Sequence, residues 1–90
     1  MPQVKFTSAL QRFFPSLQNM ETDGQTVMEV LESINHQFPG LKDYLLEEDG
    51  SLRKHVNIFL KEELIRDRNQ LSDPVKPTDE VLIFQALSGG

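Results

Sequence analysis

Residues 80–90, Glu-Val-Leu-Ile-Phe-Gln-Ala-Leu-Ser-Gly-Gly, run from an almost continuous apolar segment into two glycines. The apolar run from Val81 to Phe84 is typical of a strand inside a sheet that has a covered face. Hydrophobic periodicity then stops. We therefore expect one folded domain over residues 1–85 and a flexible C-terminal tail over residues 86–90.

The N-terminal segment predicts a β-hairpin. Residues 4–10 alternate between apolar and polar side chains, which indicates a strand whose alternate residues from Val4 to Leu10 face one way. A short second strand over residues 17–21 would pair with it. The Thr22-Asp23-Gly24 sequence that follows is typical of a turn.

The clearest local signal in the chain is a capped helix. Thr26 is a good N-cap, and Glu29 stands three residues later at the spacing of a capping box. Apolar residues at helical spacing across residues 27–38 form one stripe. Pro39-Gly40 should end the helix, because proline cannot continue the hydrogen-bond ladder and glycine accepts left-handed dihedrals. One or two further helical turns are expected within residues 41–46.

Two more strands and a loop complete the expected fold before residue 80. Residues 55–60 alternate in a way that predicts a strand, and residues 63–66 can return as a short edge strand. Residues 67–79 are polar, contain two prolines and should form a connecting loop. Asp79 and Glu80 are interpreted as surface charges near the tail that could meet a basic residue of a partner.

This order of elements leaves one face of the sheet uncovered. A single main helix cannot cover both faces of a four- or five-stranded sheet. The alternation of the strands places Phe59, Leu82 and Phe84 on the uncovered face. An exposed apolar patch of this kind usually marks a binding surface. We therefore expect these three residues to bind a partner, and ordinary core packing is the alternative.

The composition excludes several classes of protein. The 90-residue chain has 9 lysine and arginine residues against 14 aspartate and glutamate residues, and its net charge is −5. This balance argues against binding to nucleic acid or to anionic membranes. The chain has no cysteine, which excludes disulfides, cysteine-ligated zinc and cysteine nucleophiles. With no signal peptide and no apolar run of the ~18–20 residues that span a bilayer, a cytoplasmic location is expected.

The sequence predicts no catalytic site. It contains no convincing Ser/His/Asp set, no glycine-rich phosphate loop and no paired carboxylates in a suitable context. His36 and His55 lie far apart in the sequence and have no cysteine to complete a zinc site, so no metal site is expected. We expect a chain that is acted on by enzymes, binds no cofactor itself and is a monomer when alone.

The element order, ending in a strand that runs into Gly-Gly, resembles the ubiquitin-like β-grasp fold. This is an α+β fold in which a four- or five-stranded mixed sheet packs on one main helix. The chain resembles more closely the small sulfur carriers that include the molybdopterin-synthase small subunit and the thiamine-biosynthesis carrier. The residues that carry this resemblance are Val56-Asn57, Leu71 with residues 73–81, and Ser88-Gly89-Gly90. Thr78 stands where the family commonly has a glycine.

The resemblance covers essentially the whole chain and extends to a subgroup. Residues 38–41 and 49–52 lengthen the connection between the helix and the third strand. Together with the segment Arg53-Lys54-His55-Val56-Asn57-Ile58, they look most like carriers that feed sulfur to a cysteine-synthase-like enzyme.

This resemblance implies a cycle that two partners carry out. An E1-like adenylating enzyme would use ATP to activate the carboxylate of Gly90, and a sulfur donor would convert it to a thiocarboxylate. The tail residues Leu87, Ser88 and Gly89 would carry that sulfur to an accepting biosynthetic enzyme, with a cysteine-synthase-like enzyme favoured. In the family, an aromatic residue at the position of Phe84 contacts the activating enzyme.

Three alternatives remain open from the sequence. The same activated Gly90 could be passed to a lysine amine, as in a ubiquitin-like protein modifier. The chain could instead complete the active site of a molybdopterin-synthase-like enzyme as its small subunit. The third alternative is a β-grasp interaction module with a frayed end. The sequence also leaves open whether the sulfur goes to cysteine, thiamine, molybdopterin, a thiolated tRNA or a siderophore.

Overall fold

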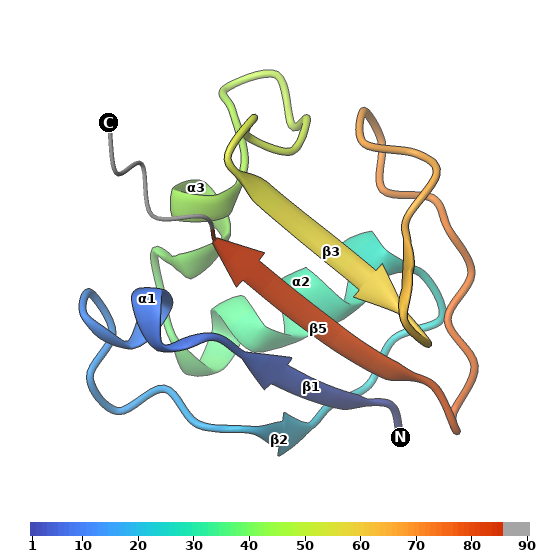
Figure 1. The fold of residues 1–90 in the computed structure, drawn as a ribbon, viewed down its shortest axis with the longest axis horizontal. Coiled ribbons are helices and arrows are strands. Elements are labelled where there is room, and N and C mark those ends of the chain that lie inside the picture. The colour runs from blue at the N-terminus through green and yellow to red at the C-terminus, as the bar shows by residue number, and fades with distance from the viewer. Residues whose placement is uncertain (86–90) are drawn as a thin grey trace.

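A mixed sheet forms the frame of the protein in a computed structural model that describes residues 1–85 (Figure 1). The strands are β1 (Gln3–Phe6), β2 (Met20–Glu21), β3 (Val56–Leu60), β4 (Glu63–Leu64) and β5 (Glu80–Gln85), and the helices are α1 (Ser8–Gln11), α2 (Val27–Gln37) and α3 (Leu41–Leu45). The sheet has five strands in the order β2-β1-β5-β3-β4, and α2 packs across one face. The predicted α+β class, a four- or five-stranded mixed sheet packed on one main helix, is confirmed, and the sheet has five strands.

Strand β5 occupies the centre of the sheet. It pairs in parallel with β1, where Val4 is opposite Val81, and antiparallel with β3, where Ile58 is opposite Ile83. The strand that leads towards residues 86–90 therefore has hydrogen-bonded neighbours on both sides. β5 is the best-anchored strand because both of its ladders are long, with four residue pairs to β1 and five to β3, whereas the ladders to β2 and β4 have two pairs each.

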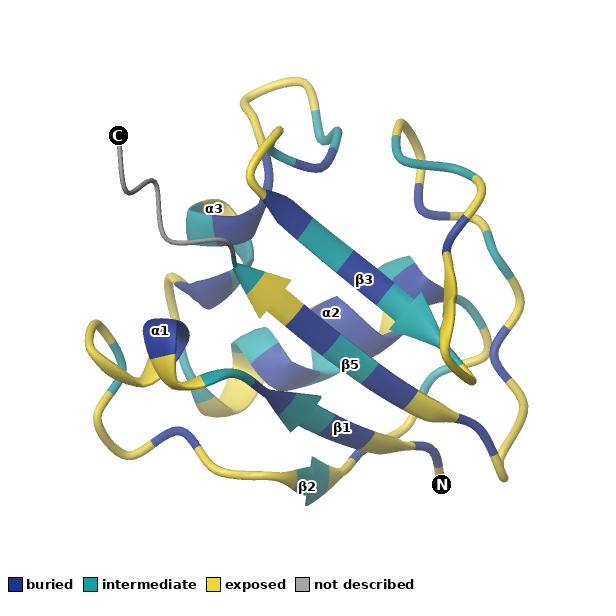
Figure 2. Ribbon diagram, viewed as in Figure 1, coloured by how far each residue is buried: buried dark blue, intermediate teal, exposed yellow. Residues whose placement is uncertain are grey.

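The hydrophobic core lies between the sheet and α2. The fully buried side chains of α2 and of the inner sheet face are Val27, Val30, Leu31, Ile34, Val4, Val56, Ile58, Val81 and Ile83. Figure 2 shows buried and more exposed residues alternating along β3 and β5, as expected where only one face of a sheet is covered.

The start of α2 confirms the predicted capping box. The Glu29 N–H donates to Thr26 Oγ1 at 3.2 Å. The Glu29 carboxylate in turn accepts the backbone N–H of Gln25 at 3.0 Å, one residue before the N-cap. The helix ends at Gln37, and Gly40 has a φ of 97°, so Pro39-Gly40 terminates it as predicted.

The N-terminal hairpin differs from its prediction. The predicted strand over residues 4–10 ends at Phe6, and α1 follows, with the Leu10 N–H donating to Thr7 O at 3.1 Å. Ala9 and Leu10 are both buried. A strand would place these neighbours on opposite faces, whereas a helical turn lets both contact the core. The partner strand β2 is likewise shorter than predicted, at two residues.

The polar connection from residue 67 to residue 79 is held in place by the carboxylate of Asp73 and by α2. Asp73 accepts the backbone N–H groups of Arg66 and Asp67 at 2.9 and 2.8 Å. The carbonyl oxygens of Asp73 and Leu71 accept the N–H groups of Val27 and Met28, at the start of α2, at 3.1 and 3.0 Å. The loop thus satisfies two of the free donors at that helix terminus.

Changing Gly24 to alanine should destabilise the fold. An added Cβ would lie 2.6 Å from Val30 Cγ2 and 2.8 Å from the Val30 nitrogen, at a φ of 154°. We expect Gly24→Ala to lower the free energy of unfolding by about 2–4 kcal/mol in urea titrations. The control is Gly50→Ala, where φ is 91° but no atom lies within 4 Å, with an expected cost of about 1 kcal/mol. Equal losses in the two variants would contradict the predicted clash.

Acid should remove part of the stability through Asp67. The Ser72 hydroxyl and the backbone N–H groups of Gln70, Asn69 and Ser72 lower the pKa of this carboxyl to about 2. Its pKa in the unfolded chain is about 3.9. Because the folded pKa is the lower one, this contribution is present above pH ~4 and is lost as the pH falls towards ~2.

The difference in urea midpoint between wild type and Asp67→Asn should therefore shrink as the pH falls from about 6 to about 2. Asp23→Asn, at an exposed aspartate in the turn before α2, is the matched control. A wild-type-to-Asp67→Asn difference that stays constant with pH would contradict the assignment.

Candidate functional site

The face of the sheet opposite α2 carries an exposed apolar surface. Phe59 on β3 lies directly opposite Leu82 on β5, and Phe84 follows two residues later on the same face. Phe59 and Leu82 are partly exposed, and Phe84 is 38% exposed. The predicted placement of these three side chains on the uncovered face is confirmed.

Sequence reasoning missed a fourth member of this surface, Leu64. The ladder between β3 and β4 places Leu64 opposite Phe59, and its side chain is 56% exposed. The sequence does place Leu64 in the predicted edge strand over residues 63–66. Which face of the sheet its side chain takes, however, depends on the pairing register, and a strand of two residues is too short to reveal that register. We refer to Phe59, Leu64, Leu82 and Phe84 as the apolar patch.

A shallow hollow of about 270 Å³ lies within the apolar patch. It is lined by Phe59, Leu82, Glu62 and Glu80, so its apolar part is flanked by two carboxylates. Glu80 also pairs with Lys5 of β1 at 3.3 Å. This arrangement suits a ligand group with an apolar body and a positive end.

The expected position of Asp79 and Glu80 near the tail is wrong. Asp79 directly precedes β5 and Glu80 begins it, whereas Gln85 ends the strand. The six residues of β5 put roughly 17–20 Å between this end of the strand and Gln85, after which the tail begins. Asp79 is also buried, so it is not a surface charge.

Asp79 organises the turn that precedes β5. It accepts the Lys76 N–H at 2.8 Å, and its other oxygen lies 3.1 Å from Lys61 Nζ. The Lys76 N–H foremost, and then the Lys61 ammonium, hold the pKa of the Asp79 carboxyl below its usual range. Its role is to fix this turn and the β3–β4 hairpin relative to each other.

The end of β5 is attached to the helical side of the protein. Gln85 Nε2 donates to the Tyr44 hydroxyl of α3 at 2.9 Å. The Tyr44 ring packs beside Phe13 and Phe14, with centroid separations of 5.2 and 5.8 Å. Figure 1 shows α1 and α3 at this end of the sheet. These contacts fix the point from which residues 86–90 start.

The Val56-Asn57 pair of β3 lies beside the same point. Val56 is opposite Gln85 in the sheet, and the Asn57 side-chain oxygen accepts Arg68 Nη1 at 3.1 Å. Arg68 Nη2 also donates to the carbonyl oxygens of Arg53 and Val56 at 2.7 and 2.9 Å. Asn57 thus helps to orient Arg68, which donates hydrogen bonds to backbone carbonyl oxygens at the start of β3.

The predicted tail residues Leu87, Ser88, Gly89 and Gly90 lie outside the described residues. The sulfur-attachment role of Gly90 and the carrier role of the tail therefore stay predictions. Residue 85, where the described chain stops, is the last residue of β5, next to Phe84 of the apolar patch.

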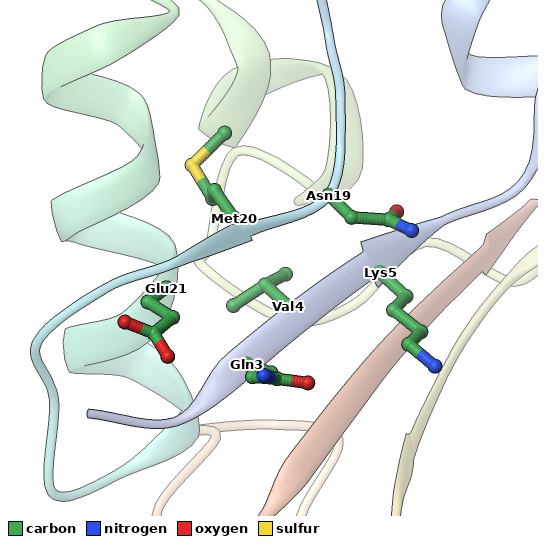
Figure 3. Close-up of a pocket in the computed structure, with 6 residues that line it drawn as sticks. All are labelled: Gln3, Val4, Lys5, Asn19, Met20 and Glu21. Carbon is green, nitrogen blue, oxygen red and sulfur yellow. The ribbon is translucent and has the colours of Figure 1, made fainter.

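A second hollow, at the edge of the sheet, offers no comparable chemistry. It measures about 370 Å³ and is lined by Gln3, Val4, Lys5, Asn19, Met20 and Glu21. Figure 3 shows that the polar side chains spread apart instead of converging on one point. Gln3 is opposite Glu80 in the sheet, so this hollow lies towards the end of β5 away from Gln85.

Residues 1–85 contain neither a metal-binding cluster nor a membrane-spanning helix. In this range no three His, Cys, Asp or Glu side chains gather closely enough to hold a metal ion, and His36 and His55 are both exposed. Nor does any helix of this range have the length and apolar character needed to cross a membrane.

Comparison with protein families identifies the family of this chain. Residues 4–90 match the ThiS family, a range that begins within β1 and continues through Gly89-Gly90. The chain belongs to the ThiS family. The predicted relationship to ubiquitin-like sulfur carriers is therefore confirmed at the level of the family.

Several relatives of this ThiS-family chain have been characterised. It is 26% identical to the sulfur carrier protein CysO of Mycobacterium tuberculosis over 74 residues, which are 80% of each protein. One chain of the BexX/CysO complex of Amycolatopsis orientalis superimposes with a TM-score of 0.85, at 26% identity and with 100% of both chains covered. The small archaeal modifier protein 1 of Methanosarcina acetivorans gives 0.76 at 28% identity, covering 98% of this chain and 94% of that one.

Replacing Phe84 should cost little stability compared with replacing its neighbour. Ile83 is fully buried, so Ile83→Ala should lower the free energy of unfolding by about 2–5 kcal/mol. Phe84 faces solvent on the apolar patch, and Phe84→Ala should cost less than half as much. Urea titrations of the two variants measure the difference. A loss for Phe84→Ala equal to that of Ile83→Ala would place Phe84 in the core and remove it from the candidate site.

Proposed function

We propose that this chain is a sulfur carrier whose Gly90 carboxylate is converted to a thiocarboxylate that donates sulfide in biosynthesis. The observation that carries the proposal is that β5 bears Leu82 and Phe84 of the apolar patch and leads into Gly89-Gly90. Membership of the ThiS family over residues 4–90 and the likeness to CysO sulfur carriers support it. The proposal requires Gly90 to be the terminal residue of the functional protein.

The proposed chemistry begins with activation by an adenylating partner. A carboxylate oxygen of Gly90 attacks the α-phosphorus of ATP and displaces pyrophosphate, which gives an acyl adenylate. Sulfide then attacks the acyl carbon, AMP leaves, and loss of a proton gives the thiocarboxylate. ATP is bound by the partner, and this chain supplies only the acyl group.

The composition of the tail suits this role. Two glycines have no Cβ to obstruct a narrow channel, and they adopt whatever dihedrals the channel imposes. Four or five extended residues reach about 14–17 Å, enough to enter a buried site. The absence of cysteine means that no thiol of this chain can attack its own activated acyl group.

The folded body has to supply the docking energy, because ordering a chain end that contains two glycines costs conformational entropy and weakens binding. The apolar patch is the surface we propose for the adenylating enzyme, since exposed aromatic anchors dominate many interfaces. That CysO of A. orientalis forms a complex with BexX supports the inference that a chain of this fold works through protein partners. For the sulfur-accepting partner, the likeness to CysO favours a cysteine-synthase-like enzyme.

A protein modifier is the second candidate function. The observation that favours it is the 28% identity to the small archaeal modifier protein 1 of M. acetivorans. Activation of Gly90 would be the same, but a lysine amine would then attack the acyl carbon. Covalent adducts of this chain in cell extracts would distinguish a modifier from a carrier.

The activation step can be tested with the purified chain, ATP and the adenylating enzyme of the same organism. Pyrophosphate release should occur with wild type and should be abolished by deletion of Gly90, while the urea midpoint stays unchanged. Phe84→Lys should raise the KM for the carrier about tenfold or more, because a charge would be buried in the interface. Gln37→Lys is the matched control, since Gln37 is exposed at the end of α2, on the opposite side of the sheet from the apolar patch.

Two outcomes would contradict the proposal. Adenylation of the chain that lacks Gly90 would show that this carboxylate is not the activated group. Equal KM values for Phe84→Lys and Gln37→Lys would remove the apolar patch from the interface.

A further inference from the structure

The hollow in the apolar patch has the chemistry of a site for a cationic side chain. We propose that it receives an arginine side chain of the adenylating enzyme, an inference that rests on the function proposed above. Four residues line the hollow: two are apolar, Phe59 and Leu82, which we call the floor, and two are acidic, Glu62 and Glu80, which we call the rim.

The floor of the hollow can hold the apolar stem of an arginine. Phe59 and Leu82 are directly paired across β3 and β5, and both are partly exposed. Long cationic side chains lay their methylene groups along apolar surfaces of this kind. A guanidinium over the Phe59 ring would also gain a cation–π interaction.

The rim carries an excess of negative charge. Glu62 and Glu80 line the hollow, and Glu63 follows at the start of β4. Two lysines lie on the neighbouring elements. Lys5 pairs with Glu80 at 3.3 Å, and Lys61 pairs with the buried Asp79 at 3.1 Å, which directs its ammonium group to Asp79. No ion pair within residues 1–85 involves Glu62, so its carboxylate remains available to a partner.

The Lys5–Glu80 pair does not block the hollow. Both side chains are about half exposed, and an exposed ion pair of this kind contributes little to stability. An incoming guanidinium can therefore share Glu80 with Lys5 while it binds Glu62. Its five donors allow it to contact two carboxylates at once.

The rim selects arginine over other occupants. An apolar side chain would remove water from the two carboxylates without replacing the lost hydrogen bonds, which is unfavourable. A lysine would satisfy the charge, but its ammonium is more strongly hydrated and does not stack on a ring as a planar guanidinium does. A hollow with an aromatic floor and two carboxylates at its rim therefore fits arginine best.

The β3–β4 hairpin presents Glu62 at the rim in an unusual backbone conformation. Lys61 and Glu62 connect the strands with φ values of 51° and 73°, where asparagine and glycine are preferred. The pairing of Leu60 with Glu63 closes the hairpin at these two residues. The turn thus places a carboxylate at a position that glycine would occupy with less strain.

A charge-reversal pair tests the proposal in the activation assay. Glu62→Lys should raise the KM for the carrier about tenfold relative to Glu48→Lys, with kcat unchanged, because only Glu62 would face the partner's arginine. Glu48 is an exposed glutamate in the turn after α3, so its replacement changes the net charge equally. Phe59→Leu keeps the floor apolar but removes the ring, and should raise the KM by about two- to fivefold. Equal KM values for Glu62→Lys and Glu48→Lys would show that the change in KM follows from net charge alone, and they would overturn the proposal.

Chemical protection identifies the partner group directly. Phenylglyoxal modifies exposed arginines, and mass spectrometry of the treated enzyme shows which are protected by the bound carrier. Wild type and Glu48→Lys should protect an arginine that Glu62→Lys leaves reactive. If wild type binds and is activated but protects no such arginine, the proposal is wrong. If wild type is not activated at all, the proposed function itself fails, so the two failures are distinguishable.

Discussion

The pairing of β5 with strands on both sides is the constraint on which the rest of the structure depends. Because β5 is held between β1 and β3, its residues must alternate between the core and the open face. Val81 and Ile83 fill the core under α2, whereas Leu82 and Phe84 face away from it. One strand therefore joins the hydrophobic core, the exposed surface and the start of the tail.

The two faces of the sheet therefore have different roles. α2 covers the inner face, and the hydrophobic core between α2 and the sheet stabilises the fold. The outer face keeps its apolar side chains partly exposed, with acidic residues at the β3–β4 end and Gln85 at the other. The apolar patch and the hollow thus lie along the line that leads to the tail. A partner that binds the apolar patch and the hollow would hold the start of the tail at a fixed place without strong contacts to the tail itself.

The sequence predicted those parts of the fold in which local signals and tertiary packing agree. The capping box and apolar stripe defined α2, and alternation in β3 and β5 predicted the open face. The N-terminal prediction failed because an alternating pattern also fits a strand that stops early, and the core then selected a turn that buries Ala9 and Leu10 together. Leu64 and Asp79 were misjudged for a related reason: register and turn hydrogen bonds, which decide their positions, are properties of the folded chain.

The central claim is that this ThiS-family chain carries sulfur on the carbonyl carbon of Gly90. The most direct test is the intact mass of the protein isolated from its own cells, with fragmentation to place any change. The proposed function predicts a fraction whose mass has increased by the exchange of one oxygen for one sulfur at Gly90. A protein that ends beyond Gly90, or whose Gly90 is found only as a carboxylate or joined to a lysine under conditions of active sulfur metabolism, would contradict it.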